Sequence, residues 1–148
     1  MFVILILSTA ALLGNEFSIG VFIHPVLARR DHERFLPAIQ VFAALFGKVM
    51  PFWMVATLIV HLVLLGFSWH WPAPSTVLLT AATLLWVAIC IFSLVGPVPI
   101  NNRVKAWDLR QLPTDWREQR QRWDRLNAAR VILIAVAFLA LVLSYRTL

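Results

Sequence analysis

The sequence lacks charge over its central third. No aspartate, glutamate, lysine or arginine lies between Val49 and Asn102, and hydrophobic residues make up 61% of the 148 residues. A soluble domain of this size normally carries fewer hydrophobic and more charged side chains. The uncharged stretch is long enough for two bilayer crossings of about 20 residues each. The composition therefore excludes an ordinary soluble domain and indicates an integral membrane protein.

Cysteine is almost absent as well. The single cysteine, Cys90, lies inside an apolar run, so it cannot form an intramolecular disulfide, and we expect it in the core. The sequence has no Cys/His cluster, no His-Glu-x-x-His run and no glycine-rich phosphate loop, so we expect neither a metal site nor a cofactor. The net charge is +6, but the basic residues gather at the ends of apolar runs, which argues against nucleic-acid binding.

Four apolar segments predict a single integral membrane domain over residues 1–148. We expect an all-α, four-helix transmembrane bundle with helices over about 2–28, 35–69, 76–95 and 115–147. At about 1.5 Å per residue the fourth helix would be roughly 45 Å long, which exceeds the roughly 30 Å hydrocarbon thickness. The bundle should therefore have an extended fourth helix that projects from the membrane, preceded by a cytoplasmic loop between the third and fourth helices.

Turn and capping residues place the ends of these helices. Ser75 is expected to cap the third helix, and Thr114 or Asp115 the fourth. Residues 96–102 contain two prolines, which should end the third helix in a turn. Two further prolines lie inside the second helix, so we expect a tilt or a kink there.

The basic residues fall almost entirely on one side of the predicted bundle. Eleven of them share that side, against Arg146 on the other: Arg29, Arg30, Arg34, Arg103, Lys105, Arg110, Arg117, Arg120, Arg122, Arg125 and Arg130. Basic loops stay in the cytoplasm. We therefore expect both termini outside and the basic loops cytoplasmic, in a bacterial inner membrane.

The first two predicted helices contain three candidate site residues, Glu16, His24 and Lys48. Glu16 is near the middle of the first helix, where an ionised carboxylate needs a partner. Lys48 in the second helix has nearly the same depth, so we expect an ion pair, which either locks the two helices together or lines a polar cavity. His24 lies near the cytoplasmic end of the first helix and is either a base or ligand, or a packing residue.

The last predicted helix carries a polar stripe. Trp116, Arg120, Trp123, Asn127 and Arg130 are spaced four, three, four and three residues apart, which places all five on one face. Arg130 enters the bilayer and must pair with a carboxylate, bind carbonyl groups or hold an anionic ligand. The stripe therefore either clamps the preceding loop onto the bundle or lines a binding site.

Two of these segments resemble a known family. Residues 99–104, Pro-Ile-Asn-Asn-Arg-Val, followed by Trp107, and the Trp-x3-Arg-x-Arg-Trp run of residues 116–123 with Arg130 resemble the small anthrone oxygenase-like membrane proteins. The stretch 15–27 is more loosely similar to their first helix. The sequence departs from many relatives at Asn127, where they have a histidine. Since asparagine cannot act as a general base, either His24 has taken over that role or the activity is lost.

The resemblance implies an oxygenase that acts on a lipophilic aromatic substrate of the anthrone, phenol or quinol type, using molecular oxygen without an obvious cofactor. The residues expected to act in catalysis are His24 and Glu16 as candidate bases, and Arg130. The residues expected to bind the substrate are Lys48, Asn101, Trp107, Trp116, Arg120, Trp123 and Asn127. The expected partners are the lipophilic substrate and the lipid bilayer. Small residues in the first helix allow close contact between helices, so a homo-oligomer is a further possibility. The alternative is a non-enzymatic membrane subunit, scaffold, or small-molecule or lipid-binding protein.

Overall fold

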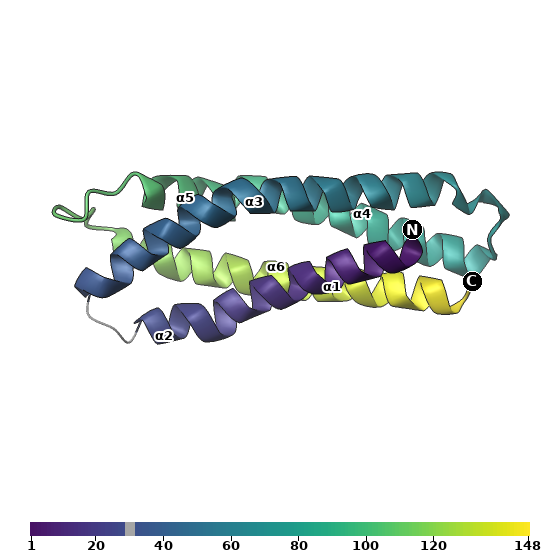
Figure 1. Cartoon of the computed structure of the whole chain (residues 1–148), viewed down its shortest axis with the longest axis horizontal. Helices are drawn as coiled ribbons and strands as arrows, with labels where there is room; N and C mark the ends of the chain where they lie inside the picture. Colours follow the sequence, from purple (N-terminus) through teal and green to yellow (C-terminus); the bar gives the residue numbers. More distant parts are fainter. Residues whose placement is uncertain (29–31) are drawn as a thin grey trace.

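The chain forms a long bundle of helices in a computed structural model that describes residues 1–28 and 32–148 (Figure 1). The elements in order are α1 (Phe2–Ser18), a π-helical segment η1 (Ile19–Ile23), α2 (His24–Ala28), α3 (His32–Gly66), a 3₁₀ turn η2 (Ser68–His70), α4 (Ala73–Val95), α5 (Pro97–Lys105) and α6 (Trp116–Arg146). No strand occurs among the described residues. Arg29, Arg30 and the side chain of Arg34, which were counted in the charge bias, lie outside them.

Four stretches of the described chain are long and apolar enough to cross a membrane. They are Phe2–Leu27, Leu36–Gly66, Ala73–Lys105 and Trp116–Arg146. The predicted all-α, four-helix transmembrane bundle is confirmed, and the chain is an integral membrane protein. The two termini lie at the same end of the bundle as the α3–α4 connection, whereas α2, the start of α3 and the α5–α6 connection lie at the other end (Figure 1).

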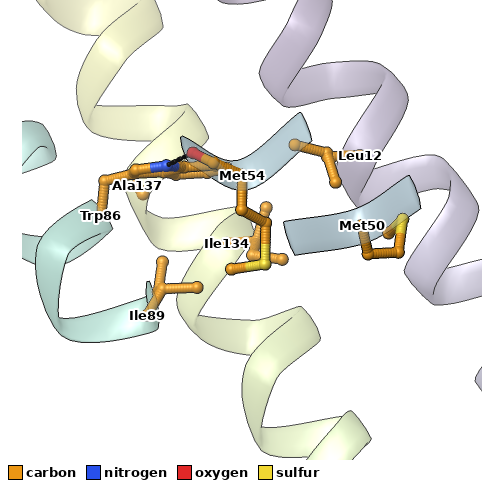
Figure 2. Packing of buried hydrophobic residues seen from close by; sticks show 7 residues of the cluster. All are labelled: Leu12, Met50, Met54, Trp86, Ile89, Ile134 and Ala137. Atoms are coloured by element: carbon orange, nitrogen blue, oxygen red, sulfur yellow. Dashed lines mark hydrogen bonds between the residues drawn. The ribbon is translucent and has the colours of Figure 1, made fainter. Parts of the chain in front are cut away.

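The middle of the bundle is closed by a hydrophobic core to which all four long helices contribute (Figure 2). Its buried members are Leu12, Met50, Met54, Trp86, Ile89, Ile134 and Ala137. The Trp86 ring is fully buried, and its Nε1 donates a hydrogen bond to the Met54 carbonyl oxygen over 3.2 Å. This core lies beside the cavity described below and closes one end of it.

Helix α4 ends at Val95, as predicted, but the third span continues beyond it. Residues 97–105 continue as helix α5, which is separated from α4 only by Gly96 with ψ at −87°. Pro97 and Pro99 occupy the first and third positions of this helix, where a backbone N–H has no acceptor within the helix, so proline loses no hydrogen bond there. The predicted turn at 96–102 is therefore wrong, and Asn101 lies on a helix.

The helix caps also differ from the prediction. Helix α4 begins after Pro72, and the buried Ser75 hydroxyl donates to the Ser144 carbonyl oxygen (2.8 Å) instead of capping α4. Asp115 does occupy the N-cap position of α6 but makes no side-chain cap. Its carboxylate accepts a hydrogen bond from Gln119 Nε2 (2.7 Å). Helix α3 contains both internal prolines and bends along its length (Figure 1).

Candidate functional site

A cavity of about 130 Å³ lies inside the bundle, between α1, α3, α4, α5 and α6. The wall contributed by α3 is apolar and includes Phe42, Phe46, Met50 and Met54. Because the two methionines also belong to the core in Figure 2, that core closes one end of the cavity. The polar side chains of the lining come mostly from the other helices: Glu16, His24, Ser93, Asn101, Arg120 and Arg130.

The π-helical segment η1 brings two of these groups onto one face. In an α-helix, residues eight apart are offset by two turns plus about 80°, so Glu16 and His24 would face different directions. The segment Ile19–Ile23 has wider turns, and the His24 N–H bonds the carbonyl of Ile19, five residues back. The wider turn takes up the extra rotation, and both side chains line the cavity. The segment ends at Ile23, two residues before Pro25, which has no N–H with which to continue the ladder.

Glu16 pairs with Arg130 across the α1–α6 contact. The carboxylate accepts a hydrogen bond from an Arg130 terminal nitrogen, and only 3% of the Glu16 side chain and 7% of the Arg130 side chain are exposed. Asn127 completes the group, since its Oδ1 accepts from Arg130 (3.0 Å) and its Nδ2 donates to the Glu16 carbonyl oxygen (3.3 Å). Gly20 leaves room for this amide, because a Cβ there would lie 2.6 Å from Asn127 Nδ2.

His24 contacts the carboxylate of Asp124, which lies on α6. Its Nδ1 lies 2.9 Å from Asp124 Oδ1, and its ring packs on Trp123 with centroids 4.3 Å apart. Arg120 Nε lies 3.9 Å from the other oxygen of the same carboxylate. A carboxylate that accepts the Nδ1–H fixes the tautomer of the imidazole and leaves the Nε2 lone pair available as a base.

Two buried N–H donors of the lining have no protein partner among the described residues. They are Trp123 Nε1 and Arg130 Nε, and both residues are more than nine-tenths buried. A buried donor without an acceptor costs about 1–3 kcal/mol. Their position at the cavity makes them available to an acceptor oxygen on a ligand.

Aromatic side chains close the end of the cavity away from the core. Trp107 and Trp116 line it there. Gln40 on α3 fixes the start of the following loop, because its Nε2 donates to the carbonyl oxygens of Val104 (3.0 Å) and Trp107 (2.8 Å). The same interaction binds the C-terminal end of α5 to α3.

Eight of the ten residues predicted for the site line this one cavity: Glu16, His24, Asn101, Trp107, Trp116, Arg120, Trp123 and Arg130. Asn127 lies behind it and contacts Glu16 and Arg130. Lys48 is exposed and is not part of the lining. The predicted Glu16–Lys48 ion pair is wrong, because equal depth does not fix rotation about the axis. Gly47 lines the cavity, and Lys48, the next residue, points about 100° away from it around the axis of α3.

Asp124, whose carboxylate contacts His24, was not predicted as a site residue. The sequence does contain a sign that Asp124 could belong to the site. It is one of only seven acidic residues, and it directly follows Trp123, which is a member of the polar stripe. Across residues 1–28 and 32–148, no three His, Cys, Asp or Glu side chains lie close enough together to hold a metal ion.

Fold and cavity together define a small integral membrane protein with an apolar interior site that carries acid–base groups. Residues 40–140 match the anthrone oxygenase family, and the chain therefore belongs to that family. Neither the curated proteins nor the solved structures contain a match to this chain. The matched region includes every cavity residue from α4, α5 and α6, whereas Glu16 and His24 lie before it.

Proposed function

We propose that this protein is a membrane-embedded oxygenase that oxidises a lipophilic aromatic molecule of the anthrone, phenol or quinol type with molecular oxygen. The observation that carries the proposal is the combination, in one cavity, of apolar walls, a histidine held by a carboxylate, and two buried N–H donors without a partner. Family membership supports the same reaction class. A scaffold would not require an acid–base group beside an apolar cavity.

The first step is the removal of a proton from the substrate. The methylene group of an anthrone is acidic, because the negative charge that forms moves onto the ring carbonyl oxygen. His24 Nε2 takes this proton, since Nδ1 is already engaged by Asp124. Arg130 Nε and Trp123 Nε1, for which the described residues offer no acceptor, stabilise the enolate oxygen by donating hydrogen bonds to it.

The carbanion carbon then gives its electrons to oxygen. A carbon–oxygen bond forms, the peroxide anion takes the proton from His24, and the carbon now carries one hydrogen and a hydroperoxide. His24 removes the second hydrogen as a proton while the O–O bond breaks. The departing hydroxide combines with that proton to give water. The methylene carbon thus becomes a carbonyl, and one O2 yields the carbonyl oxygen and one water.

The proposed orientation has both termini outside and the basic loops in the cytoplasm. The α5–α6 connection and the start of α6 carry Arg110, Arg117 and Arg122 at the end of the bundle opposite the termini (Figure 1). Positive charge at that end favours the cytoplasmic side. A spectroscopic probe attached at either terminus tests this orientation. The probe should be accessible to a membrane-impermeant quencher added from outside.

Oxygen uptake with 1,8-dihydroxyanthrone tests the proposed function. The purified full chain in lipid nanodiscs should form the anthraquinone faster than protein-free nanodiscs, which correct for spontaneous oxidation. His24→Gln should lower kcat about 100-fold or more, as expected on loss of a general base. Asp124→Asn should lower it less and change the pH profile, because Asp124 acts through His24. The matched control is Glu118→Gln, an exposed carboxylate on the same helix. Wild-type uptake no faster than the protein-free rate would rule the proposal out.

A further inference from the structure

Two residues of the cavity lining are exposed within the membrane-spanning region. Almost all residues of the lining are buried or half-buried, but Val55 is 53% and Leu94 63% exposed. Val55 belongs to the span Leu36–Gly66 and Leu94 to the span Ala73–Lys105. Exposed side chains in such spans face lipid and not water. On α3 and on α4, the lining of the interior cavity therefore extends to the surface that faces the bilayer.

The surroundings of these two residues are apolar. Pro51 lies one turn from Val55 on α3, and Cys90 lies one turn from Leu94 on α4. Both residues line the cavity and are half-buried, as is Val98 on α5. Val98 follows the break between α4 and α5 at Gly96. The charged lining residues come from other helices, with Glu16 on α1 and Arg130 on α6.

From this arrangement we infer that the cavity has a lateral entrance between α3 and α4–α5, through which an uncharged, bilayer-dissolved polycyclic phenol enters. The nature of the ligand rests on the proposed function, whereas the position of the entrance rests on the exposed lining residues alone. A charged molecule would have to cross an apolar passage without a partner, at a cost of several kcal/mol. The substrate therefore enters neutral and loses its proton only beside His24.

The other candidate path lies at the end of the cavity that carries Arg120. There Trp107 and Trp116 cover the cavity, and Arg120 lies beside Asp124. A water-soluble ligand would have to pass these groups. An entrance at that end is an outcome that the following experiment detects.

Association kinetics of a ligand test the lateral entrance. The full chain in lipid nanodiscs is mixed with 1,8-dihydroxyanthraquinone, and binding is followed by stopped-flow quenching of tryptophan fluorescence. The double variant Val55→Phe/Leu94→Phe narrows the entrance. The control Ile59→Phe/Leu84→Phe changes equally exposed residues, 54% and 65%, on the same two helices away from the cavity. Phenylalanine is tolerated at lipid-facing positions and adds no tryptophan signal.

The entrance variant should bind about tenfold more slowly, while its equilibrium Kd stays within about threefold of wild type, because a narrowed entrance slows association and dissociation together. The control should bind at the wild-type rate. Anthraquinone-2-sulfonate, a charged analogue, should not compete at a hundredfold excess. Equal rates in the two double variants, or competition by the sulfonate, would overturn the entrance while leaving the proposed function intact. No binding of the uncharged ligand to wild type would overturn both.

Discussion

The buried ion pair between Glu16 and Arg130 leads to a quantitative prediction for stability. With 3% and 7% of the two side chains exposed, neither charge is hydrated, and each depends on the other. Glu16→Gln leaves the guanidinium without a counter-ion, and an arginine cannot lose its proton to escape the cost. Removal of one partner from a buried pair costs about 3–5 kcal/mol. At 25 °C this lowers the ratio of folded to unfolded protein by at least about 100-fold.

The converse variant should be less damaging. Arg130→Met leaves a carboxyl group, which can take up a proton and become neutral. We therefore expect a smaller loss of stability than for Glu16→Gln, and one that decreases further as the pH falls. The double variant Glu16→Gln/Arg130→Met removes both charges and should recover to within about 1 kcal/mol of wild type. If the proposed mechanism holds, the double variant should remain inactive, because Arg130 is proposed to stabilise the enolate oxygen.

Unfolding of the purified protein in mixed micelles by added SDS, followed by far-UV circular dichroism, measures these free energies. Arg125→Met is the matched control, since it removes an exposed arginine from the same helix. The coupling free energy of the double-mutant cycle isolates the pair. If the losses of the two single variants simply add in the double variant, Glu16 and Arg130 do not stabilise the protein as a pair.

Two further stability predictions use the same assay. Gly20→Ala places a Cβ 2.6 Å from Asn127 Nδ2 and should cost about 1–3 kcal/mol, whereas Gly14→Ala, with nothing within 4 Å of its Cβ, should be neutral or slightly stabilising. Equal effects of the two alanines would show that Asn127 is not held against Gly20. Lys48→Gln should change the free energy of unfolding by no more than about 0.5 kcal/mol, because Lys48 is exposed and Glu16 is already paired. A loss as large as that of Glu16→Gln would contradict the assigned partner.

The four membrane spans could be predicted from hydropathy, because a bilayer requires long apolar stretches whatever the tertiary contacts are. The helix ends could not be placed to the residue. Proline at the first and third positions of α5 looks the same in sequence as proline that ends α4, and only the backbone direction after Gly96 separates the two cases. Ser75 is a residue type that commonly caps helices, but its buried hydroxyl donates a hydrogen bond to the Ser144 carbonyl oxygen instead.

The polar face of α6 could be predicted because it depends on spacing within one regular helix. Trp116, Trp123, Asn127 and Arg130 are all buried on that face. The contacts between helices could not be predicted in the same way. Depth in the bilayer can be counted along each helix, and it made Lys48 a reasonable partner for Glu16. The rotation of each helix about its own axis cannot be counted from the sequence. In the structure, this rotation directs the Glu16 side chain toward Arg130 and not toward Lys48.

The π-helical segment η1 decides which residues line the cavity, and the sequence gives little indication of it. A regular α-helix from Glu16 to His24 would turn one of them about 80° away from the cavity. Only the wider turns of residues 19–23 allow His24 and the Glu16–Arg130 ion pair to line the same cavity. Gly20, inside that segment, gives Asn127 the room to bond the Glu16 carbonyl. Glu16 and His24 both precede residues 40–140, which carry the family match. The local geometry of the first helix therefore decides whether His24, the proposed base, lines the cavity.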